Sequence, residues 1–175
     1  YYIGVDVAEG LGGKRDSSTI FVMDKNGKQV AEFKSNKIKP YEFADIVDCV
    51  GRWYNKGLLT VEKASGGHSV IERLRYDKHY MNMTKYQTYD EFKRTIWQVG
   101  FSTTPKSKSI AVNDAREWFD KGLIDIQSTD LLEEMKVFVA EDNGAFNAVS
   151  GSHDDLISAM WLCIQGAKNG FWYPF

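Results

Sequence analysis

The stretch Ile3-Gly4-Val5-Asp6-Val7-Ala8 decides how this chain folds. It is a short apolar run, rich in β-branched residues, with a single carboxylate in its middle, a pattern typical of a buried β-strand. Burying an ionised Asp6 among apolar neighbours costs several kcal/mol unless a cation meets it. The run itself contains no Lys or Arg. We therefore expect the Asp6 carboxylate to meet a cation from elsewhere.

Two further acidic positions occupy similar settings. Glu62 ends the apolar run 58–62, and Asp154 and Asp155 precede an apolar helical segment. Three carboxylate positions, far apart in sequence and each at the edge of a buried-looking element, are what a divalent metal site requires. Simpler explanations exist. Glu62 could be the exposed end of a strand, and the two Asp residues could stabilise the first turn of a helix, with Ser152 and Asp155 forming a capping box.

Composition limits the class of protein. The 175 residues are 43% hydrophobic, which is enough for one substantial core and predicts a single domain over 1–175. The net charge of -2 gives no global reason to bind nucleic acid, so DNA contacts must come from a local basic face. No apolar run approaches the roughly 18 residues of a membrane span, so we expect no membrane partner. Cys49 and Cys163 fall in apolar helical patterns and predict buried thiols, not a disulfide or zinc site.

Local patterns predict the order βββαβαβ for the first half of the chain. The first strand is followed by a strand over 18–24, a type I′ turn at Asn26-Gly27, a returning strand over 28–35, a helix from Pro40, an interior strand over 58–62, a helix carrying Val70, Ile71 and Leu74, and a short fifth strand over 80–83. Short, right-handed connections then favour a five-stranded mixed sheet with the first strand central and helices on both faces. In this α/β arrangement Asp6 and Glu62 lie on adjacent strands.

The second half of the chain is less regular. We expect a polar, basic loop within 86–109, a helix over 110–121 ending at Gly122, a brief strand over 123–126, a β-hairpin within 136–150 with Asn143-Gly144 at its tip, and a C-terminal helix from Asp154. The hairpin next to the acidic pair has two interpretations. It either guides or gates DNA, or it merely extends the sheet and closes the core.

Four groups of motifs occur in a characteristic order and spacing. They are Gly4-Val5-Asp6-Val7-Ala8-Glu9-Gly10 followed by Asp16-Ser17-Ser18, Val61-Glu62 followed by Gly67, Gly100-Phe101-Ser102-Thr103-Thr104, and Ser152-His153-Asp154-Asp155-Leu156. Together they resemble the nuclease domain of viral (tailed-phage) large terminase subunits, within the ribonuclease H-like superfamily. One departure is Lys63-Ala64-Ser65, where the family often has Asn shortly after the second acid. No side-chain role is assigned to that segment.

The resemblance implies a metal-dependent endodeoxyribonuclease that cuts concatemeric viral DNA during genome packaging. Asp6, Glu62, Asp154 and Asp155 would be the catalytic, metal-binding residues for two Mg²⁺ or Mn²⁺ ions, one activating the attacking water and one stabilising the leaving 3′ oxygen. The implied partners are double-stranded DNA, an ATPase domain of the same protein, the portal and the small terminase subunit. The start at Tyr1, almost directly in a strand, indicates a fragment without the ATPase domain. The expected location is the host cytoplasm, not the mature virion.

The sequence gives weaker evidence for a functional role of several other residues. His153 either supports the metal ligands or is an ordinary surface group at a helix start. Lys106, Lys108 and Arg116, with three cations at 85, 93 and 94 upstream, are candidate DNA-binding residues, and the alternative is that they are scattered surface charges. The Gly-rich loop 10–13 lacks the Lys-Ser/Thr ending of a P-loop and precedes a strand. We expect it to be a flexible connection beside the site.

Two other classes of function remain open. The first is part of an actin-like or sugar-kinase-like ATP-binding protein, because those folds share an opening Gly-x-Asp strand and hairpin. Ala8 and Glu9 replace the Gly and hydroxyl residues that such phosphate loops tend to carry, and one domain cannot form an interdomain nucleotide cleft. The second is a non-catalytic docking module for portal or motor subunits. The presence of all three acidic positions argues against a dead enzyme.

Overall fold

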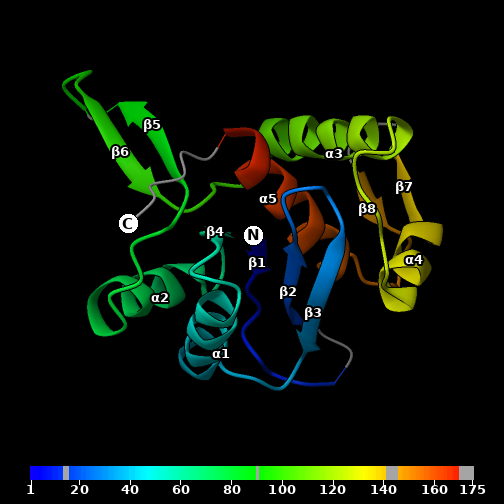
Figure 1. Cartoon of the computed structure of the whole chain (residues 1–175), viewed down its shortest axis with the longest axis horizontal. Helices are drawn as coiled ribbons and strands as arrows, with labels where there is room; N and C mark the ends of the chain where they lie inside the picture. Colours follow the sequence, from blue (N-terminus) through cyan, green and yellow to red (C-terminus); the bar gives the residue numbers. More distant parts are fainter. Residues whose placement is uncertain (14–15, 90, 141–145, 170–175) are drawn as a thin grey trace.

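A mixed four-stranded sheet forms the centre of the computed structural model, which describes residues 1–13, 16–89, 91–140 and 146–169 (Figure 1). The strands are β1 (Tyr2–Asp6), β2 (Ser18–Met23), β3 (Gln29–Ser35) and β4 (Leu58–Val61). Their order is β3-β2-β1-β4. The first three strands form an antiparallel meander, and β4 lies parallel to β1. The predicted meander, the parallel crossover and the central position of the first strand are confirmed.

The turn between β2 and β3 is not the expected type I′ turn. A type I′ turn needs positive φ at both central residues, and only Gly27, with φ of 86°, satisfies this, whereas Asn26 does not. The Asp24 carboxylate instead accepts hydrogen bonds from the N–H groups of Asn26 and Lys28 at 2.8 and 2.9 Å. Because a side chain stabilises the turn, one left-handed residue is sufficient, and the strand pairing shifts at a bulge beside it.

Helices cover both faces of the sheet, as predicted. On one face lie α1 (Pro40–Trp53) and α2 (Gly67–Glu72), which continues into a π-helical turn, η1 (Arg73–Asp77). On the other lie α3 (Pro105–Asp120), α4 (Thr129–Lys136) and α5 (Asp155–Asn169). Strand β2 contributes to both cores, because Ile20 and Val22 point to the first face and Phe21 and Met23 to the second. Of the two cysteines, Cys163 is buried as expected, but Cys49 is exposed.

The expected fifth strand over 80–83 is absent from the described residues. Two separate segments share that edge of β4 instead, because Met83 makes one parallel bridge to Leu59 and Phe101 makes one to Glu62. The Leu59 N–H donates to the Asn82 carbonyl oxygen at 3.0 Å. Between these two bridges the chain leaves the edge and returns, so neither segment stays beside β4 long enough to form a strand.

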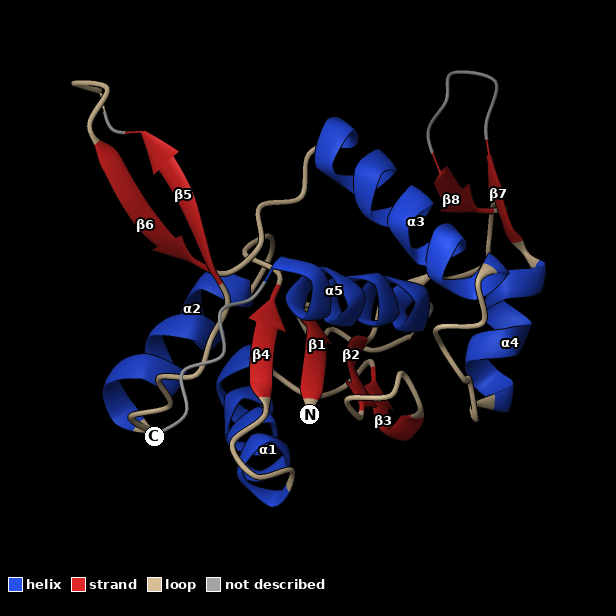
Figure 2. Cartoon of the chain, turned by 45° about the horizontal axis from the view of Figure 1, so that its top comes forward, coloured by secondary structure: helices blue, strands red, loops and turns tan. Residues whose placement is uncertain are grey.

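The region expected to be a polar loop, 86–109, contains regular structure. Strands β5 (Lys85–Tyr89) and β6 (Thr95–Val99) form an antiparallel hairpin that projects from the body of the molecule (Figures 1 and 2). Helix α3 then begins at Pro105, earlier than expected, and the Thr104 hydroxyl caps it by accepting a hydrogen bond from the Ser107 N–H at 3.1 Å. The sequence does not predict this hairpin. Most of its residues are exposed, so its strands lack the regular apolar alternation that marks a strand with one buried face.

The segment that follows α3 departs from prediction in two places. Residues 123–126 make a single bridge, between Asp125 and Lys28, and not a strand. Helix α4 was not expected. The second hairpin is confirmed as β7 (Phe138–Ala140) paired with β8 (Phe146–Ala148). Its predicted tip, Asn143-Gly144, lies outside the described residues, so its role in gating DNA stays a prediction.

Helix α5 lies directly across β1, and Gly4 makes this possible. A Cβ atom at Gly4 would lie 1.8 Å from the Ala159 carbonyl oxygen and 2.5 Å from the Cys163 nitrogen, so no side chain fits between strand and helix. The helix is buried on all sides from Asp155 to Gly166. Even so, no helix in the described part of the chain is both long and apolar enough to cross a membrane.

We expect Gly4→Ala to lower the free energy of unfolding by about 3 kcal/mol or more, because the added methyl group meets backbone atoms of α5 and not a movable side chain. Gly122→Ala is the control. Gly122 has φ of 63°, but its Cβ would meet nothing within 4 Å, so only backbone strain of about 1 kcal/mol is expected. Urea unfolding measures both changes. Equal losses would show that Gly4 does not limit the approach of α5 to β1.

Candidate metal centre

The carboxyl ends of β1 and β4 bring the first two acidic residues together. Asp6 is the last residue of β1 and Glu62 directly follows β4. Val5 and Val61 are paired in the parallel ladder, so the two acids are one step further along adjacent strands. The Glu62 N–H donates to the Val5 carbonyl oxygen at 2.9 Å. A Cβ atom at Gly67 would lie 1.8 Å from the Glu62 carbonyl oxygen. Close backbone packing therefore fixes Glu62 beside Asp6.

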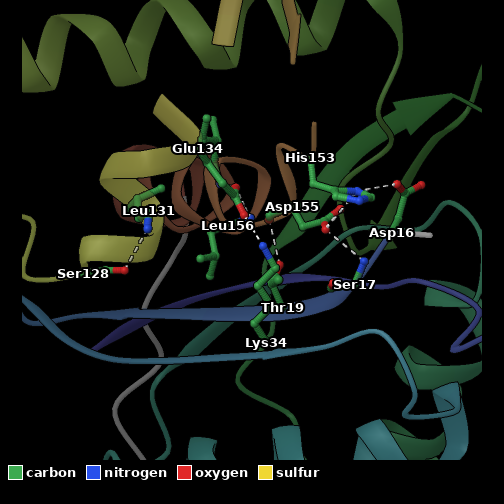
Figure 3. A network of polar contacts seen from close by, with 11 residues as sticks. Asp16, Ser17, Thr19, Lys34, Ser128, Leu131, Glu134, His153, Asp155 and Leu156 are labelled. Atoms are coloured by element: carbon green, nitrogen blue, oxygen red, sulfur yellow. Dashed lines mark hydrogen bonds and ion pairs between the residues drawn. The ribbon is translucent and has the colours of Figure 1, made fainter. Parts of the chain in front are cut away.

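Asp154 and Asp155, at the start of α5, complete a cleft of ≈ 680 Å³ that all four predicted acidic residues line. Asp155 is only 5% exposed. The Ser17 N–H donates to Asp155 Oδ2 at 2.9 Å, and the Thr19 hydroxyl donates to the Asp155 carbonyl oxygen at 2.7 Å (Figure 3). The beginning of β2 thus holds Asp155 in the same cleft as the carboxylates at the ends of β1 and β4.

A further acidic residue, Glu134 of α4, positions α5 and was not predicted. Its Oε2 accepts hydrogen bonds from the N–H groups of Leu156 and Ile157 at 2.8 and 3.2 Å, and its Oε1 lies 2.5 Å from Lys34 Nζ on β3 (Figure 3). Glu134 is 7% exposed. The alternative in which Ser152 caps this helix does not fit, because α5 begins three residues after Ser152. A carboxylate from another helix therefore satisfies the N–H groups of the first turn.

The cleft opposes the ionisation of Asp6. Burial raises the pKa of Asp6 well above its usual value. Hydrogen bonding to the Glu62 carboxyl group raises this pKa further, as do the negative charges of Glu62, Asp155 and Asp154. A carboxylate whose pKa is raised by neighbouring negative charges gains free energy when a cation binds beside it.

Asp155 responds to the same environment. Burial raises the pKa of Asp155 to about 6, against the hydrogen bond from the Ser17 N–H, which lowers it. The charges of Asp16 and Glu134 raise this pKa and His153 lowers it. At neutral pH the folded protein therefore keeps Asp155 ionised at a cost in stability.

Lys108 is the one predicted DNA-binding residue that lies in the cleft. Among the described residues of the lining it alone is positively charged, and its Nζ lies 3.2 Å from both Asp154 Oδ2 and Asn147 Oδ1. Lys106 and Arg116 are exposed on α3 and do not belong to this lining. The three upstream cations belong to the β5–β6 hairpin. The candidate basic residues are therefore divided between two elements, helix α3 and the β5–β6 hairpin.

Asp16, His153 and Asp155 form a second group of potential metal ligands. One ligand atom from each residue lies within 4.8 Å of the others. His153 Nδ1 is 3.3 Å from Asp16 Oδ1 and 3.9 Å from Asp155 Oδ2 (Figure 3). The His153 side chain therefore lies next to the acidic cleft. Asp16 had no predicted role, although its place between the Gly-rich loop and β2 was the available signal.

We expect Glu134→Ala to lower the free energy of unfolding by about 3 kcal/mol, because it leaves two N–H groups of α5 without an acceptor and Lys34 without its ion-pair partner. The adjacent Glu133 is the control. Its side chain is 70% exposed and pairs with the similarly exposed Lys136, so Glu133→Ala should change stability by less than about 1 kcal/mol. Chemical denaturation of the two variants measures the difference. Similar small effects would mean that Glu134 does not hold α5.

The free energy of unfolding in EDTA should fall as pH rises from about 4 to about 7. The pKa of Asp155 is about 6 in the folded protein against an ordinary 3.8, so the folded state binds more protons than the unfolded state within this window. Asp155→Asn should lose that part of the pH dependence, on the order of 3 kcal/mol at most. Unfolding curves at pH 4.5 and 7.5 measure it, with Asp125→Asn as control. An unchanged pH dependence in Asp155→Asn would contradict the assignment.

Several solved structures of viral nuclease domains share this fold. The large terminase nuclease from thermophilic phage G20c with bound magnesium has a TM-score of 0.72 and 17% identity, over 93% of this chain and 79% of that chain. The Thermus phage P74-26 domain has a TM-score of 0.71 and 16% identity, over 99% and 83%. The bacteriophage SPP1 domain with bound Mn has a TM-score of 0.56 and 15% identity, over 94% and 84%.

Sequence comparison agrees with this fold. No curated protein sequence matches the chain. A family model described as the terminase RNaseH-like domain matches residues 3–165, which include all four predicted acidic residues of the cleft. The resemblance drawn from the motifs is therefore confirmed, and the chain belongs to the terminase RNaseH-like domain family.

Proposed function

We propose that this chain is a divalent-metal-dependent endonuclease domain that hydrolyses DNA phosphodiesters during viral genome packaging. The observation that carries the proposal is the convergence of Asp6, Glu62, Asp154 and Asp155 in one cleft at the carboxyl ends of β1 and β4. Membership of the terminase RNaseH-like domain family supports a nuclease role. Similar folds have been solved with magnesium, cobalt, zinc and Mn, which supports the use of a divalent cation.

The chemistry of the cleft fits Mg²⁺ or Mn²⁺. Both cations prefer carboxylate oxygens, and the raised pKa of Asp6 reflects the repulsion that such a cation would relieve. Asp6, Glu62, Asp154 and Asp155 would hold the metal. Asp155 also belongs to the group with Asp16 and His153, and this sharing supports the proposal of two ions. When bound, such cations activate water and stabilise the charge on the leaving oxygen.

The remaining residues of the cleft orient its carboxylates and moderate their charge. The hydrogen bond from the Ser17 N–H keeps Asp155 Oδ2 in one position. Lys108 lies against Asp154 and reduces the negative charge that an approaching DNA phosphate meets. In the hydrolysis, the oxygen of water bonds to phosphorus as the bond from phosphorus to the 3′ oxygen breaks, leaving a 3′-hydroxyl and a 5′-phosphate. The role of these residues is to present fixed charges to that phosphate.

The biological setting is part of the same proposal. The substrate would be concatemeric double-stranded DNA, cut in the host cytoplasm before the virion is complete. The partners would be an ATPase domain of the same large terminase, the portal and the small terminase subunit. Membership of the terminase RNaseH-like domain family supports the packaging role.

The β1–β2 loop argues against the alternative of an ATP-binding fragment. The Gly12 N–H donates to the Asn36 carbonyl oxygen at 2.7 Å, and a Cβ at Gly10 would lie 2.1 Å from the Ile38 carbonyl oxygen. The loop is packed against the connection between β3 and α1, so this N–H group is not available to a phosphate. A non-catalytic docking module is the remaining alternative, and cleavage assays separate it from a nuclease.

We expect the protein to nick and degrade plasmid DNA with Mg²⁺ or Mn²⁺, without strong sequence preference, and EDTA to stop the reaction. Asp6→Asn should reduce cleavage by at least about 100-fold, because it removes a metal-binding charge without changing side-chain volume.

Mn²⁺ at 100 times its Kd should stabilise the wild-type protein by about 2.7 kcal/mol, and Asp6→Asn should lose most of this stabilisation.

Asp125→Asn is the control, because Asp125 lies on the surface away from the cleft and pairs with Gln127. This variant should cut DNA and respond to Mn²⁺ like the wild type. Wild-type cleavage by Asp6→Asn would show that the proposed site is wrong. Equal stabilisation of both variants by Mn²⁺ would indicate nonspecific ion binding.

A further inference from the structure

The β5–β6 hairpin is joined to the backbone beside Glu62. Strand β6 ends at Val99, and Phe101, two residues later, bridges to Glu62. The Lys63 N–H donates to the Phe101 carbonyl oxygen at 2.9 Å, and Lys63 Nζ donates to Gln98 Oε1 at 2.8 Å. The base of the hairpin is therefore fixed by main-chain and side-chain hydrogen bonds to the residue that follows Glu62.

The hairpin extends beyond the same edge of the sheet as the acidic cleft. In Figure 2 the arrows of β1 and β4 point toward the top of the view, and the β5–β6 hairpin projects to the upper left, past the ends of those strands. Asp6 and Glu62 lie at those strand ends. A long molecule that crosses the cleft toward that side would meet the hairpin.

One face of the hairpin carries exposed aromatic side chains. The antiparallel register pairs Tyr89 with Thr95 and Gln87 with Trp97, which places these four residues on the same face. Tyr89 is 68% exposed and Trp97 is 57% exposed. On the opposite face, Tyr86 packs against the Phe101 ring with the ring centroids 5.4 Å apart. One aromatic side chain therefore anchors the hairpin, while two on the other face contact solvent.

The tip adds another aromatic ring and two cations. Phe92 is 76% exposed, and the Arg94 guanidinium lies 5.2 Å from the centre of its ring. Lys93 is exposed and has φ of 59°, a left-handed conformation in the turn between the strands. Segment 85–99 contains three cations and two acids, in a chain whose net charge is -2. The hairpin is thus a positively charged element of an acidic protein.

Exposed aromatic rings next to cations on a β-surface suit DNA. Bases stack on aromatic side chains without regard to sequence, and Lys or Arg neutralises neighbouring phosphates. Polar residues, Gln87 and Thr95, lie on the same face as Tyr89 and Trp97, so this face presents polar groups next to its aromatic rings. The charge of the hairpin and its continuity with the cleft edge both favour DNA as the occupant.

We propose that the β5–β6 hairpin is a second DNA-binding element, which contacts the DNA to one side of the cleft through Tyr89, Trp97 and Lys93. This inference rests on the proposed nuclease function, because it assumes that DNA enters the cleft. The hairpin would recognise a phosphodiester backbone whose bases have accessible faces. Both a single strand of DNA and a frayed duplex end have these features.

Fluorescence anisotropy in EDTA tests the proposal with a labelled single-stranded oligonucleotide and a labelled blunt duplex. Trp97→Ala should weaken binding of at least one of them by about fivefold or more. Trp53→Ala is the matched control, because Trp53 is 82% exposed at the end of α1, and it should bind like the wild type. Loss on the single strand alone would identify base stacking. Loss on both would identify contacts with the backbone as well, and either result supports the proposal.

A charge variant provides an independent test. Lys93→Gln should make log Kd less dependent on log salt concentration, by about one unit of slope. Lys25→Gln, an exposed lysine in the turn between β2 and β3, should not. Unchanged affinity of Trp97→Ala for both DNA forms, together with an unchanged salt slope for Lys93→Gln, would overturn the proposal and leave a protein partner as the alternative.

The test also separates this inference from the nuclease proposal. Both hairpin variants should keep the stabilisation by Mn²⁺, which shows that they are folded and that the cleft is intact. If the wild type cuts DNA and the hairpin variants bind it normally, only the hairpin inference fails. If the wild type does not cut but the hairpin variants lose DNA affinity, the nuclease proposal fails and only the contact between the hairpin and DNA is supported.

Discussion

The contact between Gly4 of β1 and the backbone of α5 is the constraint on which the rest of the site depends. The missing side chain lets the helix rest on the strand itself, near Ala159 and Cys163. A second glycine, Gly166, does the same further along, where a Cβ would lie 2.3 Å from Thr60 Oγ1 on β4. Two close approaches define the direction of the helix across the sheet. The position of Asp155 relative to the ends of β1 and β4 follows from that direction.

Polar contacts then fix the start of α5, where packing alone would leave it free to fray. Gln29 Oε1 of β3 accepts hydrogen bonds from the N–H groups of Gln127 and Ser128, at 2.8 and 3.0 Å, just before α4. The opposite end of α4 reaches β3 again through the ion pair of Lys34 with Glu134. An edge strand that contributes no residue to the cleft thus anchors the helix whose carboxylate caps α5. Strand β3, helix α4 and helix α5 together hold the acidic site in position.

The central sheet and the four acidic residues could be predicted from sequence, because short apolar runs predict buried strands and each acid lies within or directly beside such an apolar segment. The edge of the sheet could not, since Met83 and Phe101 each contribute one bridge and leave no periodic signal. Glu134 could not be distinguished from Glu133, because two adjacent residues of one type differ only in how α4 docks. Gly4 lies in the strand that decides the fold, but the sequence does not show that α5, more than 150 residues later, packs directly on it.

The place of α5 in the chain has a consequence for synthesis. A ribosome delivers β1 and β4, with Asp6 and Glu62, before α3, α4 and α5 exist. The core on the α5 side of the sheet cannot close until that helix arrives, because α5 supplies more than half of its buried residues, including Leu156 and Trp161. Asp154 and Asp155, two of the four predicted acidic residues of the cleft, arrive with the same helix. A nascent chain therefore completes its second core and its charged cleft in one event, and an incomplete chain has neither.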